Sequence, residues 1–259
     1  MEEILFAYDK NLELDVNDPV LNDFFKSSRI KPNIYDNMRS LTQDMVKNKI
    51  SLSYLPAANY FYFKDDNFYR PIANAQFAAN RSDVNSSLLV VRKDSNVKTL
   101  ADLRGKSLGY IHPFCTSSYF APAILLQENG DSIETFFSSK KMVGAWQLQV
   151  DAVINRVVDA TSIQEDIWHR LPKNSEFTKI IASIGNLPSP LILAAQNLDP
   201  SFVKEFSQLL LSYKPESKAG LLFNGFIPFD EKLVASFYQK AELAFQGDPL
   251  LQSFNIKTS

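Results

Sequence analysis

Short apolar runs alternate with amphipathic segments along almost the whole chain, and no other feature of the sequence restricts the fold as much. Ile4–Tyr8 and Leu191–Ala195 have the length and apolar character of buried strands, whereas Met38, Leu41 and Met45 recur at helical spacing. Strands that alternate with helices predict an α/β fold with mixed sheets flanked by helices. The predicted strands are Ile4–Tyr8, Ile30–Tyr35, Ile50–Leu55, Ser87–Arg92, Gly105–Ile111, a short element Lys140–Val143, Val157–Thr161 and Leu191–Ala195. The predicted helical segments are Val20–Ser27, Asn37–Asn48, Thr99–Arg104, a helix from near Thr116, Trp146–Asn155, Pro200–Ser212 and Asp230–Phe245.

The charge of the chain is nearly balanced, with 27 basic and 29 acidic residues and a net charge of -2. Such a chain has no net positive potential that would attract nucleic acid or an anionic membrane, so local hydrogen-bond donors must hold any bound anion. No uninterrupted apolar run approaches the roughly 20 residues that cross a bilayer. The beginning, Met-Glu-Glu-Ile-Leu-Phe, is acidic where a secretory signal is basic and then apolar. A cytoplasmic protein and an exported protein whose signal has been removed both fit this beginning.

The stretch Tyr110–Pro122, Tyr-Ile-His-Pro-Phe-Cys-Thr-Ser-Ser-Tyr-Phe-Ala-Pro, places three small hydroxyl residues at the start of a predicted helix. Thr116, Ser117 and Ser118 follow a strand-like run and a proline, where the first N–H groups of a helix lack intrahelical partners. Main-chain donors, hydroxyls and the positive end of the helix dipole can therefore converge on a phosphate-like group. The same pattern is typical of a plain helix cap, and the spacing alone fits both interpretations.

Three successive runs between Leu88 and Pro122 are specific enough to identify a family. They are Val-Val-Arg-Lys-Asp-Ser, Thr-Leu-Ala-Asp-Leu-Arg-Gly-Lys and Pro-Phe-Cys-Thr-Ser-Ser-Tyr-Phe-Ala-Pro. Together they resemble the PhnD-like phosphonate, phosphate and phosphite substrate-binding proteins of ABC transporters, which belong to the type 2 periplasmic binding protein superfamily. The similarity covers nearly the whole chain, because Met45–Tyr60, Gln149–Ala160 and Ser183–Pro190 also resemble segments of the family.

The resemblance implies a two-lobed fold that closes over a ligand in the cleft between the lobes. The implied lobes are residues 1–88 with 195–259, and residues 89–194. Two crossing strands, near Leu88–Lys93 and Pro190–Ala195, are expected to act as the hinge. The last two predicted helices are expected to pack on the first lobe.

The resemblance also implies which residues bind the ligand. The family's Ser-Thr-Ser-Gly phosphonate loop corresponds to Cys115, Thr116, Ser117 and Ser118, so Thr and Ser are kept. Cys115 is a weaker donor than the serine it replaces, and Ser118 has a Cβ atom where the family has glycine.

Other family positions fall elsewhere in the chain. A phosphonate-binding tyrosine falls near Met38, with Tyr35 or Asn37 able to take its place, and an aromatic wall falls on Asn85 or Ser86. The acidic pair that holds an amino group falls on Asp166, with Glu165 beside it, and on Ser189. The complete predicted set is Tyr8, Tyr35, Asn37, Pro56 and Ala57 on one wall, Cys115, Thr116, Ser117 and Ser118 opposite, and Asn85, Asp166 and Ser189 for the remainder of the ligand.

These implications favour a solute-binding protein without catalytic activity or cofactor. It would capture a small anionic or zwitterionic, phosphonate-like or phosphate-like compound outside the cytoplasm and present it to an ABC permease or a sensor. One alternative is a cytoplasmic enzyme on the same scaffold, like the pyrimidine-precursor or menaquinone-pathway proteins, with Cys115 as nucleophile and His112 as the nearest base in sequence. A ligand-sensing domain of a receptor is another. His112, His169 and Cys115 have no metal-ligand spacing, so we expect no metal.

Overall fold

The computed structural model describes residues 3–12, 14, 16–77, 84–170, 172–214 and 223–246. The chain forms two compact units, the first made of Met1–Asp83 and Ser189–Glu231 and the second of Val84–Pro188 and Lys232–Ser259. The chain thus changes unit at residues 84, 189 and 232, whereas the predicted lobes change at 89 and 195. Parts of the predicted lobes, at 78–83, 215–222 and 247–259, lie outside the described residues.

The first unit is built on a six-stranded mixed sheet in the order β11-β4-β10-β3-β1-β2. The strand β1 pairs in parallel with β2 and β3, while β10 and β4 run antiparallel to their neighbours. The carboxyl ends of β1, β2 and β3 therefore lie along one edge of this sheet. The strands are β1 Ile4–Asp9, β2 Ile30–Tyr35, β3 Leu52–Leu55, β4 Tyr69–Phe77, β10 Leu191–Ala195 and β11 Phe223–Ile227.

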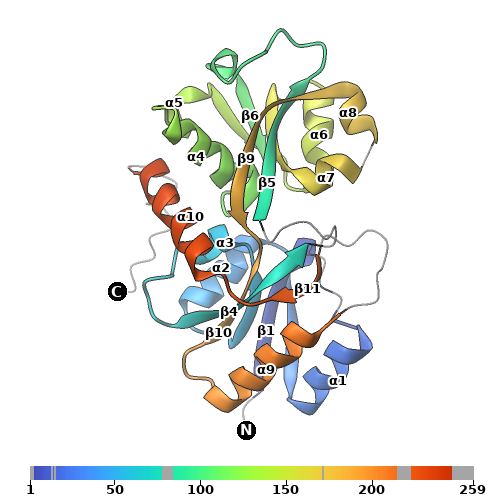
Figure 1. Ribbon diagram of the computed structural model, residues 1–259, viewed down its shortest axis with the longest axis vertical. Helices are drawn as coiled ribbons and strands as arrows, with labels where there is room; N and C mark the ends of the chain where they lie inside the picture. Colours follow the sequence, from blue (N-terminus) through green and yellow to red (C-terminus); the bar gives the residue numbers. More distant parts are fainter. Residues whose placement is uncertain are drawn as a thin grey trace. The chain divides into compact units, whose positions relative to one another are not determined.

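Apolar rings form the core of this unit. Phe206 of α9 is fully buried, and its ring contacts those of Phe6 in β1 and Phe25 in α1. The helices α1 and α9 each begin at an Asp-Pro pair. The carboxylates of Asp18 and Asp199 cap these helices by accepting hydrogen bonds from the first free N–H groups. The helical segments are η1 Lys10–Leu12, α1 Pro19–Ser27, α2 Met38–Val46, α3 Ala57–Tyr60 and α9 Pro200–Ser212 (Figure 1).

The second unit is built on a five-stranded mixed sheet in the order β7-β6-β8-β5-β9. The strand β6 is parallel to β7 and β8, and β5 is antiparallel to both β8 and β9. The carboxyl ends of β6 and β8 and the amino end of β5 therefore share one edge. The strands are β5 Val84–Arg92, β6 Ser107–Tyr110, β7 Ser139–Met142, β8 Ala160–Gln164 and β9 Thr178–Pro188.

Helices of the second unit bury their apolar sides against this sheet and one another. The ring of Phe120 is fully buried and lies 5.8 Å from that of Phe237 and 4.6 Å from that of Phe245, centroid to centroid. These contacts place α10 on the second unit, whereas the sequence predicted that it packs on the first lobe. The helical segments are η2 Ala101–Leu103, the π-helical turn η3 Thr116–Phe120, α4 Ala121–Glu128, α5 Ile133–Phe136, α6 Trp146–Ile154, α7 Glu165–Arg170, α8 Pro172–Phe177 and α10 Glu231–Ala244.

Most predicted elements are present, and the differences have physical reasons. The predicted strand Val157–Thr161 starts three residues late, as β8, because Val157 and Val158 lie in the connection after α6. The strand β4 was not predicted because Pro71 and Asn74 are typical of loops. A register shift at Leu193, opposite Pro71, accommodates the proline. Among the described helices, none is long and apolar enough to span a membrane.

Candidate ligand-binding site

Six of the predicted ligand residues come together at one edge of the second unit. Asn85 lies at the amino end of β5, the turn Cys115–Ser118 follows β6, and Asp166 follows β8. The register pairs Ser87 of β5 with Gln164 of β8, so all three segments meet where β6 and β8 end. Ligands of α/β sheets gather beyond such carboxyl ends.

The segment after β6 is a π-helical turn rather than the ordinary helix start that the sequence predicted. The N–H groups of Tyr119 and Phe120 both donate to the carbonyl of Cys115, at 3.2 Å each. The Cys115 Sγ atom caps the turn by accepting from the Ser118 N–H at 3.4 Å. Isolated π turns of this kind are frequent at functional sites.

The hydroxyls of the turn have different roles. Ser118 is fully buried and its Oγ accepts a hydrogen bond from the Ile111 N–H at 3.1 Å, which ties the turn back to the end of β6. The Ser117 Oγ lies 3.6 Å from the Cys115 Sγ. The Ser117 N–H has no hydrogen-bond partner within the described chain. The turn therefore has a main-chain donor of the kind that the predicted anion cradle requires.

A buried polar network holds this turn on the sheet. The Ser87 Oγ donates to the Ser117 carbonyl and lies 2.9 Å from the Ser162 Oγ. The Gln149 Nε2 donates to the Ser162 carbonyl at 2.8 Å and to the Thr161 Oγ1 at 3.0 Å. The ligand predictions missed Ser87 and Gln149 because their roles depend on which strands and helices are neighbours. The only signal in the sequence was polar residues within otherwise apolar runs.

The acidic residues after β8 lie at the start of α7. The Ser86 Oγ donates to Glu165, and His169 lies 3.7 Å from the same carboxylate, Nε2 to Oε1. Asp166 is half-buried, and Asn85 is buried and pairs with Leu187 of β9. Glu165 thus has two protein partners at this edge.

The other predicted ligand residues share an edge of the first unit. Tyr8, Tyr35 and Pro56 lie at or just beyond the carboxyl ends of β1, β2 and β3. Asn37 caps α2 by accepting from the Ser40 N–H at 2.9 Å. Ala57 begins α3 and is fully buried. Ser189 precedes β10, whose Leu191 pairs with Leu55, and its Oγ accepts from Asn74 at 3.4 Å.

Tyr35 and Asp44 form a hydrogen-bonded pair at this edge. The Tyr35 hydroxyl donates to the Asp44 Oδ2 at 2.9 Å. Burial, together with this bond and the negative charge of Asp44, raises the pKa of Tyr35 to about 12. Burial favours a higher pKa for Asp44 too, but hydrogen bonds from Lys49 and Tyr35 outweigh it and the pKa is lowered. At neutral pH, Tyr35 is therefore protonated and its hydroxyl donates to the Asp44 carboxylate.

The variant Tyr35→Phe is expected to lose about 1 kcal/mol of unfolding free energy at pH 7, because one hydrogen bond is removed. The pKa of Tyr35 rises from 10.0 to about 12 on folding, so its stabilisation is complete below pH 10 and is lost as the pH rises through 12. The difference in unfolding free energy between wild type and Tyr35→Phe should therefore decrease between pH 10 and 12. Urea unfolding at pH 7 and in this alkaline range measures it, and a constant difference would contradict the assignment.

The geometry around Cys115 bears on the enzyme alternative. The Nδ1 atom of His112 accepts a hydrogen bond from the Phe114 N–H at 3.1 Å, so this nitrogen is occupied by the turn itself. Burial lowers the pKa of His112 to about 4. The Cys115 Sγ interacts with Ser117 and Ser118 instead of an imidazole. This arrangement is that of a capping thiol.

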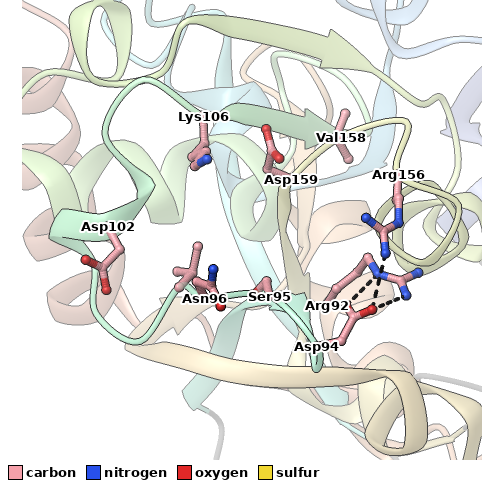
Figure 2. Close-up of a pocket in the computed structure, with 10 residues that line it drawn as sticks. Arg92, Asp94, Ser95, Asn96, Asp102, Lys106, Arg156, Val158 and Asp159 are labelled. Atoms are coloured by element: carbon pink, nitrogen blue, oxygen red, sulfur yellow. Dashed lines mark hydrogen bonds and ion pairs between the residues drawn. The ribbon is translucent and has the colours of Figure 1, made fainter.

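A separate hollow of about 470 Å³ lies at the opposite edge of the second unit's sheet (Figure 2). Most of the charged groups that line it form ion pairs or hydrogen bonds with other protein groups. Arg92 makes two hydrogen bonds to the Asp94 carboxylate, and Arg156 lies 3.3 Å from the same group. Asp159 accepts from the N–H and Oγ of Ser107, which holds the start of β6. These contacts support a structural role for the lining residues, so we place the candidate site at the other edge.

Comparison with known proteins identifies the family. A family model described as "ABC transporter, phosphonate, periplasmic substrate-binding protein" matches residues 27–234. The chain belongs to this family. The predicted membership among periplasmic phosphonate-binding proteins is therefore confirmed, and with it the solute-binding class of function. A search of curated protein sequences finds no match.

Solved structures agree with this phosphonate-binding family in fold. XAC2383 from Xanthomonas citri bound to ATP has a TM-score of 0.77 at 16% identity, with 98% of this chain and 100% of that chain covered. The binding protein component PA3383 of an ABC phosphonate transporter from Pseudomonas aeruginosa has a TM-score of 0.73 at 17% identity, covering 100% and 91%. PhnD1 from Prochlorococcus marinus in complex with methylphosphonate has a TM-score of 0.69 at 16% identity, covering 92% and 97%. The predicted α/β class, with two mixed sheets flanked by helices in a periplasmic-binding-protein fold, is confirmed.

Proposed function

We propose that this phosphonate-binding family member captures a small tetrahedral oxyanion, of the phosphonate or phosphate class, at the turn Thr116–Phe120. The observation that supports the proposal is the buried start of the turn. There the Ser117 N–H has no partner in the described chain, and the hydroxyls of Thr116 and Ser117 accompany it. Main-chain and hydroxyl donors at the start of a helix suit an oxyanion.

The remaining predicted residues supply further contacts in this proposal. In the second unit, Cys115 and Ser118 shape the turn, Asn85 contacts the ligand, and Asp166 binds a cationic group when the ligand carries one. In the first unit, the proposed contacts are Tyr8, Tyr35, Asn37, Pro56, Ala57 and Ser189. Ligand contacts that exist only in a closed form would shift the equilibrium towards that form by their free energy.

We also propose the physiological setting of this binding. The protein acts in the periplasm or another extracytoplasmic compartment and delivers its ligand to an ABC permease, without catalysing a reaction. The family match supports the compartment and the partner. The geometry of Cys115 supports a binding role for the site, because its Sγ atom interacts with Ser117 and Ser118 of the turn itself.

The experiment that tests the proposal is a thermal-shift and calorimetry panel of methylphosphonate, 2-aminoethylphosphonate, phosphate, phosphite and ATP. A ligand at 100 times its dissociation constant stabilises the folded protein by about 2.7 kcal/mol. We expect at least one phosphonate or phosphate compound to raise the unfolding temperature by several degrees. Methanesulfonate extends the panel to a different oxyanion class. An unchanged unfolding temperature with every phosphorus compound would refute the proposed ligand class.

A further inference from the structure

Gln164 carries a buried polar group that the fold leaves without a partner. The residue ends β8 and is 7% exposed, and its Nε2 atom has no hydrogen-bond partner among the described atoms. A buried amide N–H without a partner costs free energy, so native proteins rarely keep one without a reason. Gln149, in the same unit, is 1% exposed but donates to two acceptors. The two buried glutamines therefore differ: the Nε2 atom of Gln149 has hydrogen-bond partners, and that of Gln164 has none among the described atoms.

The position of Gln164 relates it directly to the turn. It is paired with Ser87 across β5 and β8, and directly opposed residues of an antiparallel pair project from the same face of the sheet. Ser87 donates from this face to the carbonyl of Ser117. The Ser117 N–H is itself without a partner in the described chain. The Gln164 Nε2 and the Ser117 N–H are therefore two donors without a described partner, and Ser87 connects the strand and the turn that carry them.

We propose that Gln164 is a specificity-determining residue whose Nε2 donates a hydrogen bond to an oxygen of the bound oxyanion. The inference rests on the proposed function, because it assigns the ligand to the turn Thr116–Phe120. Both the amide nitrogen and the Ser117 N–H are donors only, so each pairs with an acceptor oxygen, and a negatively charged oxygen accepts the stronger hydrogen bond. The site therefore favours a tetrahedral group that places a negatively charged oxygen at each of these two positions. The hydrogen bond missing in the free protein forms when the ligand binds.

The test compares wild type with Gln164→Met and Gln164→Glu, with methylphosphonate and methanesulfonate as probes in calorimetry. Methionine has a similar length but no donor, so Gln164→Met should weaken binding about 10- to 100-fold. Glutamate replaces the donor by an acceptor and a negative charge, so Gln164→Glu should weaken binding further. Equal affinity in wild type and Gln164→Met would overturn the inference, as would tighter binding by Gln164→Glu.

Stability of the free protein supplies an independent readout. Because the Gln164 Nε2 atom has no partner among the described residues, Gln164→Met should unfold at the same temperature as wild type or higher. The matched control, Gln149→Met, removes a donor from two buried acceptors and should lower the unfolding temperature by several degrees. A loss of stability in Gln164→Met as large as in Gln149→Met would assign Gln164 a structural role and overturn the inference.

The outcomes also separate this inference from the proposed function. Wild type that binds neither probe nor any phosphorus compound of the panel refutes the proposed ligand class and, with it, the ligand contact assigned to Gln164. Wild type that binds, together with a Gln164→Met variant of undiminished affinity, refutes the inference alone. Reduced affinity with unreduced stability supports both.

Discussion

Replacing Thr116 and Ser117 together by alanine is expected to weaken methylphosphonate binding by roughly 3–6 kcal/mol. Each hydroxyl is proposed to donate one hydrogen bond to a charged oxygen, and such a bond contributes about 1.5–3 kcal/mol. The fold should persist, because the hydrogen bonds of the Ser117 carbonyl and the Ser118 Oγ remain in the double variant and tie the turn to the sheet. Calorimetry measures the affinity, and circular dichroism with thermal unfolding checks the fold.

Ser132→Ala is the matched control for this double variant. The Ser132 Oγ caps α5 of the same unit by accepting from the Glu134 N–H at 3.2 Å. Its removal should cost about 1 kcal/mol of stability, as for other helix caps, and leave binding unchanged. If the double variant behaved like Ser132→Ala, losing stability but keeping its affinity, Thr116 and Ser117 would be a helix cap and the proposed anion contacts would be wrong.

The nearly neutral charge of the chain determines how such a site can work. With a net charge of -2, the protein as a whole does not attract an anion. Binding must then depend on short-range hydrogen bonds, which are strong where water is excluded. Thr116, Ser117 and Gln164 are each less than 10% exposed and satisfy that condition. Affinity should therefore respond more to the loss of a single donor than to salt concentration.

Local chemistry explains why several elements could be predicted with accurate bounds. The helix Pro200–Ser212 starts where Asp199 and Pro200 provide a cap and a first-turn proline, and both act within a few residues. The strand Leu191–Ala195 is a continuous apolar run in the middle of its sheet. The strand β9 was not predicted, because Gly185, Asn186 and Pro188 are typical of a return loop. Pairing of Ile184, Leu187 and Pro188 with β5 keeps this segment in a strand, and Gly185 and Asn186 lie at a register shift within it.

Some residues of the candidate site could be predicted from a local motif, whereas others depend on how distant strands pair. Cys115, Thr116, Ser117 and Ser118 are consecutive, so a motif could predict that they act together. The network that includes Ser87 depends on the register between β5 and β8, which no local pattern specifies. A strand as polar as Ala160–Gln164 also differs from the apolar runs by which buried strands are recognised. It can be buried because hydrogen bonds satisfy Thr161 and Ser162.

Phe120→Ala is expected to have the largest effect on stability, about 3–5 kcal/mol of unfolding free energy. Phe120 is the last residue of the π turn and is fully buried, with its ring against those of Phe237 and Phe245. Its removal opens a cavity beneath α10 and takes away the apolar contact that fixes the end of the turn. Affinity for methylphosphonate should therefore fall as well. Urea unfolding and calorimetry, at a temperature where the variant is folded, measure the two effects.

Phe206→Ala separates the two consequences. Phe206 is also fully buried, but it packs against Phe6 and Phe25 in the core of the first unit, whereas the turn belongs to the second. A similar loss of stability is expected from a cavity of similar size, whereas affinity measured on the folded protein should stay close to that of wild type. An equal loss of affinity in both variants would indicate that general destabilisation weakens binding. A loss confined to Phe120→Ala would show that the contact between the turn and α10 positions the donors of the ligand site.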